Sequence, residues 1–348
     1  MSETRGQNPF LFASGVPRSG TTLLQRMLDN HPELAVANDS HFIPRALEKT
    51  DKSLVVDARN GVAIPLTPEL AKSVFEYHRF WRLGIDRTEF EQVRDDSETY
   101  QQLVAELYDL FARKSGKRLA GEKTPDYVRR LDLLHGLFPE AKLIHLVRDG
   151  RDVALSLLHW AKPDKGPGRI ELWKNQPIAV CALWWRWMVT AAREQVAQID
   201  PANYLAVHYE RLVSSPSNTM ENTCQFLDLD YSPRMVEFHR GKVRENRELS
   251  VKSAWLAPQT GLRNWRNQMP PEQIALFEAL ASDALQEHGY ELSSERISGQ
   301  VLTVASECQN WWDENFLAKQ NECCVAGHQP VRDTAAQASC AQPVWEER

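Results

Sequence analysis

This sequence has no apolar run long enough to cross a lipid bilayer, and its polar first nine residues contain no apolar signal segment. It also has no excess of positive charge, because 41 lysines and arginines are opposed by 47 acidic residues, for a net charge of −6. No global attraction to nucleic acid or to an acidic membrane is therefore expected, and any anion site must be local. We expect a cytoplasmic protein without a transmembrane segment.

The chain also lacks metal-binding cysteine pairs. None of its six cysteines has the spacing of a zinc site, and the adjacent Cys323 and Cys324 are a poor zinc signal. Because no signal segment is present, we interpret the cysteines as reduced thiols. There are no internal repeats. The length of 348 residues, with 42% hydrophobic and 25% charged residues, allows one large α/β domain or two small ones.

The most informative stretch is FLFASGVPRSGTTLLQRMLDN, residues 10–30. Residues 10–14 predict a buried strand, residues 15–20 a tight loop, and the following residues a helix. A strand, loop and helix in this order point backbone N–H groups at one spot, where the helix dipole adds positive potential. The pattern predicts a phosphate-binding loop, whose contacts are Arg18, Ser19, Gly20, Thr21 and Thr22.

The spacing of this loop is close to that of a nucleotide-binding P-loop. Gly15 and Gly20 are spaced as in that motif, but Thr21 takes the place of its lysine, and the cation Arg18 comes earlier. A P-loop kinase or ATPase uses the lysine on the outer phosphates, beside a metal ion. The loop therefore favours a phosphate ligand without the apparatus of NTP hydrolysis. An ordinary turn between a strand and a helix, or a conventional NTPase, remains the alternative.

Two further candidates follow predicted strands. Residues 34–37 predict a second strand, which places Asp39 and His41 just beyond its carboxyl end, where ligands bind in open parallel sheets. Lys123 is held near another strand end, because Pro125 restricts the residue before it to extended geometry. A fixed ammonium there suits a developing negative charge. The alternatives are that Asp39 caps a turn and that Lys123 is a solvated lysine.

A second anion contact is predicted after the strand at residues 143–147. A P-loop NTPase would have an acidic metal ligand there, but this strand is followed by Arg148, whose planar guanidinium suits phosphate. The turn from Arg148 to Arg151 leads into a helix expected to begin at Asp152. Ser156, one turn into that helix, can add a hydroxyl to the same anion. The alternative is a surface arginine.

Helical patterns flank these strands. Residues 67–81 and 97–114 predict a helical insertion whose two helices are joined by a charged, exposed link at residues 87–97. Trp184, Trp185 and Trp187 are interpreted as core packing or the rim of a cleft. Residues 204–208 predict a further strand, and residues 261–266 combine arginines with an aromatic, a set that can clamp a nucleotide.

The predicted domain organisation has three parts. Residues 1–295 form the main domain, and residues 296–320 contain a C-terminal amphipathic helix. This helix either packs on the body of the protein or makes an oligomer contact, such as that of a homodimer. Residues 321–348 show no periodicity and predict a disordered tail.

The two phosphate motifs together, residues 15–22 and residues 147–151 with Ser156, resemble the cofactor motifs of the PAPS-dependent sulfotransferases. PAPS is 3′-phosphoadenosine 5′-phosphosulfate. The resemblance implies that the first loop binds the 5′-phosphosulfate and that Arg148 and Ser156 bind the 3′-phosphate. It extends over about residues 10–289 and implies a P-loop NTPase-like, three-layer α/β fold with a central parallel sheet flanked by helices.

Within the family, residues 15–22, followed by Met-Leu-Asp-Asn-His-Pro and Ile-Pro-Arg, are similar to the tyrosylprotein sulfotransferase branch. The base of that branch is a glutamate at the position of Asp39, and heparan sulfate sulfotransferases carry a base in a similar segment. Lys123 matches the lysine that stabilises the transferring sulfuryl group. Further cofactor contacts are implied by the resemblance for Tyr209, Ser250 and Arg263.

Two departures leave the acceptor open. Asp39 is one methylene shorter than the usual glutamate, and His41 stands where the protein-tyrosine branch has an arginine that helps hold an acidic peptide. We predict single-step, metal-free sulfuryl transfer from PAPS to a hydroxyl of a small molecule, glycan, lipid or tyrosine. Asp39 is the predicted base with His41 in reserve, and Lys123 and Arg18 stabilise charge. The alternatives are a non-catalytic nucleotide-binding protein and a P-loop kinase.

Overall fold

The computed structural model describes residues 8–160, 166–240, 257–293 and 297–319. The chain forms two compact units. Unit 1 consists of Met1–Arg148 and Ala191–Leu262, and unit 2 of Asp149–Thr190 and Arg263–Arg348. None of the helices in the described ranges is both long and apolar enough to cross a membrane.

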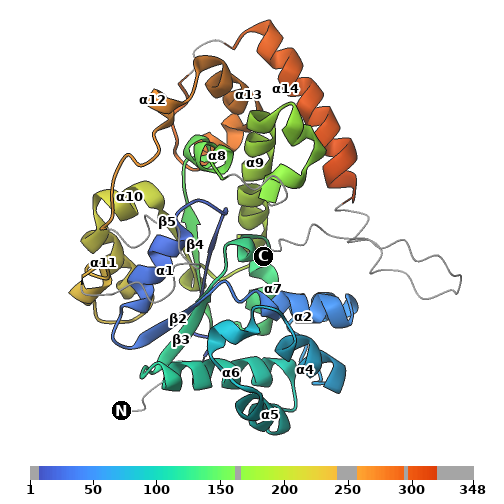
Figure 1. The fold of residues 1–348 in the computed structure, drawn as a ribbon, viewed down its shortest axis with the longest axis vertical. Helices are drawn as coiled ribbons and strands as arrows, with labels where there is room; N and C mark the ends of the chain where they lie inside the picture. The colour runs from blue at the N-terminus through green and yellow to red at the C-terminus, as the bar shows by residue number, and fades with distance from the viewer. Residues whose placement is uncertain (1–7, 161–165, 241–256, 294–296, 320–348) are drawn as a thin grey trace, which may run out of the picture. The chain divides into compact units, whose positions relative to one another are not determined.

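Unit 1 is built on a five-stranded parallel sheet with the strand order β2-β3-β1-β4-β5 (Figure 1). Because all strands run in the same direction, their carboxyl ends lie at one edge of the sheet. The predicted strands at residues 10–14, 34–37, 143–147 and 204–208 are confirmed. The strands are β1 (Leu11–Gly15), β2 (Leu34–Asn38), β3 (Leu119–Lys123), β4 (Lys142–Val147) and β5 (Tyr204–His208).

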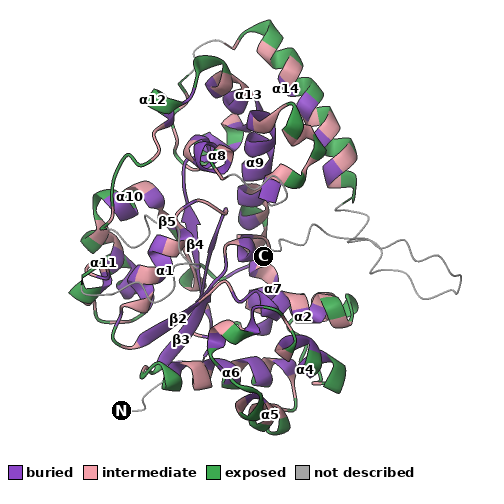
Figure 2. Cartoon of the chain, viewed as in Figure 1, coloured by how far each residue is buried: buried purple, intermediate pink, exposed green. Residues whose placement is uncertain are grey.

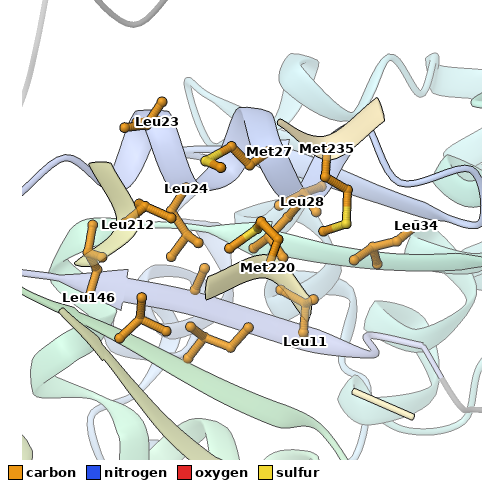
Figure 3. Packing of buried hydrophobic residues seen from close by; sticks show 14 of the residues in the cluster. Leu11, Leu23, Leu24, Met27, Leu28, Leu34, Leu146, Leu212, Met220 and Met235 are labelled. Carbon is orange, nitrogen blue, oxygen red and sulfur yellow. The ribbon is translucent and has the colours of Figure 1, made fainter. Parts of the chain in front are cut away.

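Helices cover both faces of this sheet. Leu11 of β1 belongs to an apolar cluster with α1 (Thr21–Asp29), and Figure 3 shows Leu24 and Leu28 of that helix pointing towards the strand. Phe12 contacts the rings of Tyr127 and Phe138 instead. Successive strand residues point to opposite faces, so β1 packs on helical segments on both sides. The predicted three-layer α/β fold is confirmed.

The remaining helices of unit 1 connect the strands or follow the last of them, β5. Strands β1 to β4 are buried almost throughout, whereas α5 is largely exposed (Figure 2). The helices are α2 (Phe42–Thr50), α3 (Ser53–Arg59), α4 (Pro68–Phe75), α5 (Arg87–Asp95), α6 (Tyr100–Lys114), α7 (Leu131–Leu137), α10 (Tyr209–Ser214) and α11 (Pro216–Phe226), with the 3-10 turns η1 (Phe80–Leu83), η2 (Pro125–Arg129), η5 (Pro201–Asn203) and η6 (Pro233–Met235).

The helical insertion is confirmed, but its division differs from the prediction. The helix expected at residues 67–81 ends at Phe75, and a separate 3-10 turn follows. The helix expected from residue 97 starts at Tyr100, because Thr99 caps it. The link predicted at residues 87–97 was wrong: this segment is α5, which begins with a capping box of Asp86 and Glu89.

Unit 2 is helical. Helix α8 begins at Gly150, two residues before the predicted Asp152, because the Asp149 side chain accepts a hydrogen bond from the N–H of Arg151. Trp184 and Trp185 are buried, which confirms the core interpretation for these two, whereas Trp187 is half-buried and packs on the ring of Phe316. The helices are α8 (Gly150–Leu158), α9 (Pro177–Val196, of which the part up to Thr190 belongs to unit 2), α12 (Trp265–Gln268), α13 (Pro271–Glu287) and α14 (Gly299–Trp312), with the 3-10 turns η3 (Gly166–Arg169) and η4 (Glu171–Lys174) and the π-helical segment η8 (Asp313–Leu317).

The predicted C-terminal helix is confirmed: α14 spans Gly299–Trp312 and continues through the π-helical segment Asp313–Leu317 to residue 319. It contacts α13, and its buried residues are Ala305, Cys308 and Trp312. Within unit 2 the helix therefore packs on the body of the protein, while a homodimer contact stays a prediction. The predicted tail at residues 321–348 lies outside the described residues.

Candidate functional site

The loop after β1 has the backbone of an anion-binding site. Gly20 precedes α1 in the left-handed region, with φ of 98°. A Cβ at this position would lie 2.5 Å from ring carbons of Tyr209, so both the dihedral angle and the close packing require glycine. Thr21 and Thr22 open the helix. The first N–H groups of a helix have no partner within it and lie at its positive end.

The burial and hydrogen bonding of the Ser19 side chain show whether this loop can bind an anion. Its side chain is 0% exposed, and its Oγ has no hydrogen-bond partner among the described residues, although buried hydroxyls nearly always have one. The N–H of Ser19 donates to the carbonyl of Val16 over 3.0 Å, which closes the loop. Arg18 has φ of 78°, a strained value that clusters at ligand sites. The loop therefore fits a phosphate or sulfate group that accepts from Ser19 and the helix N–H groups.

Arg148 lies against this loop because β4 is the neighbour of β1 in the sheet. Its guanidinium is 4.1 Å from the centre of the Tyr209 ring, and its Nη1 is 3.5 Å from the carbonyl oxygen of Arg18. Tyr209, the first residue of α10, thus contacts Arg148 and also lies against Gly20. The ends of β1, β4 and β5 therefore bring together four predicted site residues, namely Arg18, Gly20, Arg148 and Tyr209.

Asp39 and Lys123 form an ion pair at the ends of β2 and β3. The Lys123 Nζ lies 2.8 Å from Asp39 Oδ1, and the N–H of Asp39 donates to the carbonyl of Lys123 over 2.7 Å. The Lys123 side chain is 1% exposed, whereas that of Asp39 is 23% exposed. The alternative of a solvated Lys123 is therefore excluded. The pair combines a buried ammonium with a carboxylate that solvent can reach.

The charges around Asp39 decide its protonation state. Burial alone would raise the pKa of Asp39 above its ordinary 3.8, but Lys123, His41 and Arg82 together outweigh burial and lower it. Asp39 is therefore a carboxylate at neutral pH. It can accept a proton, but while Lys123 holds it the carboxylate is a weaker base than an ordinary aspartate.

His41, the reserve base, is buried. Burial lowers its pKa from 6.5 to about 3; Arg79 and Arg45 act in the same direction, while Asp39 and Asp126 oppose the change. The imidazole is therefore neutral at physiological pH. Neither group is a strong base there, but the Asp39 side chain is 23% exposed whereas His41 is buried, so Asp39 remains the stronger candidate because an acceptor can reach it.

Two residues that hold Asp39 were missed by the sequence reasoning. Arg82, from η1, donates its Nη1 to the carbonyls of Asn38 and Asp39 over 2.9 Å each and lies 3.8 Å from Asp39 Oδ2. Glu122 accepts hydrogen bonds from the N–H groups of the two residues after Asp39. An acidic residue inside a buried strand was the available signal for Glu122, while nothing local marks Arg82.

Three other predicted cofactor contacts lie either in unit 2 or outside the described residues. Ser156 lies on α8 and is nearly buried, and Arg263 immediately precedes the segment that leads into α12, so both belong to unit 2. Ser250 lies outside the described residues. The roles of all three stay predictions.

The residues after Arg148 have a structural role within unit 2. The buried Arg151 donates to Asp149 over 2.8 Å and to Glu278 over 2.6 Å, and its guanidinium lies 3.7 Å from the ring centre of Trp265. The Nε1 of Trp265 donates to Asp149 over 2.9 Å. The aromatic of the expected nucleotide clamp at residues 261–266 is therefore buried inside unit 2.

Comparisons with known proteins agree on one family. Residues 9–233 match the sequence model of the Sulfotransferase family. Nodulation protein NoeE of Sinorhizobium fredii is 29% identical over 330 residues, which are 87% of this chain and 73% of that protein. Protein-tyrosine sulfotransferase A of Caenorhabditis elegans is 25% identical over 284 residues, 79% of this chain and 65% of that protein.

The Drosophila melanogaster protein-tyrosine sulfotransferase is 27% identical over 231 residues, which are 66% of this chain but 40% of that protein. The chain thus spans less than two thirds of both protein-tyrosine relatives. Among solved structures, the sulfotransferase domain of the Synechococcus PCC 7002 olefin synthase has a TM-score of 0.55 at 23% identity and covers 84% of this chain and 98% of that domain, which supports the fold. Because the family model matches more than half of its length, this chain belongs to the sulfotransferase family.

Proposed function

We propose that this protein transfers the sulfuryl group of PAPS to a hydroxyl oxygen in a single in-line step. The observation that carries the proposal is the meeting of an anion-binding loop, an arginine and a lysine–carboxylate pair at one edge of a parallel sheet. Membership of the sulfotransferase family supports sulfuryl transfer as the reaction class. The donor, the acceptor and the individual roles are our proposals.

The donor side has two places for anionic groups. The Ser19 hydroxyl and the N–H groups of Gly20, Thr21 and Thr22 would hold the 5′-phosphosulfate, since their donors converge at the start of α1. Arg148 would hold the 3′-phosphate, with its guanidinium kept in place by the Tyr209 ring. Bound PAPS supplies a sulfuryl group already attached to a phosphate leaving group. Further donor contacts are proposed for Ser156, Ser250 and Arg263.

The acceptor side supplies the proton transfer. Asp39 would remove the proton of the acceptor hydroxyl as a general base. A lysine ammonium has three donor N–H groups, so Lys123 can bind Asp39 Oδ1 with one and stabilise negative charge on the sulfuryl oxygens with another. Arg18 would add positive charge at the leaving phosphate. Because these fixed donors neutralise the charge that develops, the proposed step needs no metal ion.

The acceptor is proposed only as a hydroxyl compound. Protein-tyrosine sulfotransferases and a nodulation protein are similar to this chain at comparable identity, so their names do not select tyrosine over a small molecule, glycan or lipid. The neutral His41 brings no cation for an acidic peptide. An acceptor screen with fractionated extracts follows directly from this proposal.

A donor assay tests the proposed function. The protein is incubated with sulfur-labelled PAPS or phosphorus-labelled ATP and pools of hydroxyl acceptors, without and with magnesium. Transfer of labelled sulfate without magnesium is the expected result. Binding of PAPS without transfer to any pool would favour the non-catalytic alternative, and transfer of labelled phosphate would favour the kinase.

Arg148→Ala tests the assignment of the donor side. We expect its affinity for 3′-phosphoadenosine 5′-phosphate to fall by about tenfold or more, because a charge-assisted phosphate contact is lost. Affinity for adenosine 5′-phosphosulfate, which lacks the 3′-phosphate, should change little, and this ligand is the matched control in calorimetry. Equal losses for both nucleotides, or no loss, would reject the 3′-phosphate contact.

A further inference from the structure

We infer that Glu122 is a positioning residue for the proposed base: it holds the backbone turn that presents Asp39 to the acceptor. The inference rests on the proposed function. The turn runs from the last residue of β2 to the residue before α2, residues 38–41, and is called the base turn below. Glu122 lies 82 residues from it in the sequence.

The base turn has a backbone that needs support from outside. Asp39 has φ of 54° and His41 has φ of 59°, and neither is a glycine. Left-handed conformations crowd a Cβ against the neighbouring carbonyl, so residues with side chains adopt them only where surrounding contacts enforce them. Two such residues within three positions indicate that the presentation of Asp39 is imposed on the chain.

The polar backbone groups of the turn are bonded to side chains and to a strand. The carbonyls of Asn38 and Asp39 accept from Arg82, and the N–H of Asp39 donates to the end of β3. The next two N–H groups, those of Ser40 and His41, both donate to Glu122 Oε1, over 2.8 and 3.0 Å. Glu122 is therefore the side-chain anchor of the half of the turn that follows the base.

The surroundings of Glu122 fix its orientation. Its side chain is 0% exposed, and no cation among the described residues forms an ion pair with it. Oε2 accepts from the hydroxyls of Tyr108, over 2.6 Å, and Tyr127, over 3.1 Å, while the Thr124 hydroxyl donates to Oε1. Burying a carboxylate is costly, and the pairing of β3 uses backbone groups that any residue has. The carboxylate is thus explained by the turn that it binds.

The adjacent residues Glu122 and Lys123 bind different parts of the base turn. Successive residues of a strand point to opposite sides, so only one of the two can reach the carboxylate of Asp39. Lys123 takes that carboxylate, and Glu122 takes the amides behind it. Glu122 therefore lies behind the turn and acts on turnover through Asp39.

The test compares variants at Glu122 for turnover and for donor binding. Glu122→Ala should lower kcat by roughly 10 to 100-fold, since displacing a reacting group by about 1 Å can cost that much. The affinity for 3′-phosphoadenosine 5′-phosphate should stay unchanged, because the phosphate loop is not touched. Glu122→Gln should recover most of kcat, because its amide oxygen still accepts from both N–H groups and its NH₂ can donate to the tyrosine hydroxyls.

Tyr108→Phe is the matched control. It removes a donor to the far oxygen of Glu122 but leaves both bonds to the base turn, so kcat should remain within about threefold of the wild type. A second control is the double variant. If Glu122 acts through Asp39, Glu122→Ala causes no further loss of kcat in Asp39→Asn, whereas a general structural defect would add its own loss.

Hydrogen exchange of the amides of residues 34–43 gives a readout that needs no acceptor. Exchange at Ser40 and His41 should accelerate in Glu122→Ala and not in Tyr108→Phe. If the alanine variant does not fold, Glu122→Asp takes its place, because it keeps the charge but falls one methylene short of the turn. A wild-type kcat in Glu122→Ala, or in Glu122→Asp where it replaces the alanine variant, would overturn the inference. Unchanged exchange at Ser40 and His41 would overturn it as well. A wild-type protein that transfers no sulfate would instead refute the proposed function, while the exchange experiment still decides whether Glu122 holds the turn.

Discussion

The phosphate loop, residues 15–22, and the base turn, residues 38–41, lie at the same edge of one sheet but obtain their shapes differently. The loop takes left-handed steps at Gly20 and at Arg18, and its closing hydrogen bond, from Ser19 to Val16, is local. The base turn has no glycine and is held by Arg82 and Glu122, which are 43 and 82 residues away from their partners. The phosphate loop is therefore closed by a local contact, whereas the base turn is held by long-range contacts.

The largest effect is expected at the tip of the base turn. Asp39→Asn should lower kcat by about a thousandfold, because an amide cannot take the acceptor proton. Binding of 3′-phosphoadenosine 5′-phosphate, measured by calorimetry, should be almost unchanged. Asp39→Glu is the control, since it keeps a carboxylate and should retain measurable turnover. Full activity in the asparagine variant would show that Asp39 is not the general base. The base turn would then no longer differ from the phosphate loop in serving turnover and not nucleotide binding.

On the donor side the corresponding change is Gly20→Ala. A residue with a Cβ pays about 1–2 kcal/mol for the left-handed φ, and the Cβ would also meet the Tyr209 ring. We expect the affinity for 3′-phosphoadenosine 5′-phosphate to fall by roughly 30-fold or more. Gly61→Ala is the matched control, because Gly61 has φ of 70° but no atom closer than 3.7 Å to the added Cβ. Gly61→Ala should lower stability without affecting nucleotide affinity. Equal losses of nucleotide affinity in the two variants would show that the effect of Gly20→Ala is not local to the phosphate loop.

The same contrast explains what could be predicted from the sequence. Strands β1 and β4 were predicted to within a residue, since buried parallel strands are continuous apolar runs, and β5 was found from its sequence although most of it is not buried. The phosphate loop followed from its glycine spacing. Asp39 and Lys123 were selected because they lie near strand ends. The contacts of Arg82 and Glu122 depend on the tertiary fold: nothing local marks Arg82, and an acidic residue inside a buried strand marks Glu122 without indicating its partners.

The helices of the insertion illustrate a second limit. Helix α5 was missed because its charged composition resembles an exposed link, although the capping box of Asp86 and Glu89 marks its start. Helices α2, α3 and α7 are short, so their apolar residues repeat too few times to stand out. Such short elements are stabilised mainly by packing, which a single sequence does not display.

His41 provides a pH test of how tightly the base turn is enclosed. Its pKa is about 3 in the folded protein against 6.5 as the ordinary value, so the unfolded chain binds more protons between these values. Stability is therefore complete above about pH 6.5 and is lost as the pH falls through this window, by about 2 kcal/mol between about pH 7 and pH 5. Urea unfolding at both pH values measures this loss. His41→Asn, which tolerates the left-handed backbone, should lose less stability over the same interval; an identical loss would show that His41 is not enclosed as described.

The smallest effect is expected at Arg82, which binds the first half of the base turn. Arg82→Lys keeps the positive charge near Asp39, but one ammonium cannot reproduce the planar fork that meets the carbonyls of Asn38 and Asp39. Asn38 and Asp39 are partly exposed, whereas Ser40 and His41, whose amides Glu122 holds, are buried, so water can replace part of the lost contact and we expect kcat to fall by only about fivefold. The affinity for 3′-phosphoadenosine 5′-phosphate should not change. If Arg82→Lys instead weakened nucleotide binding, the two regions would be coupled, and the division between a locally closed phosphate loop and a remotely held base turn would not hold.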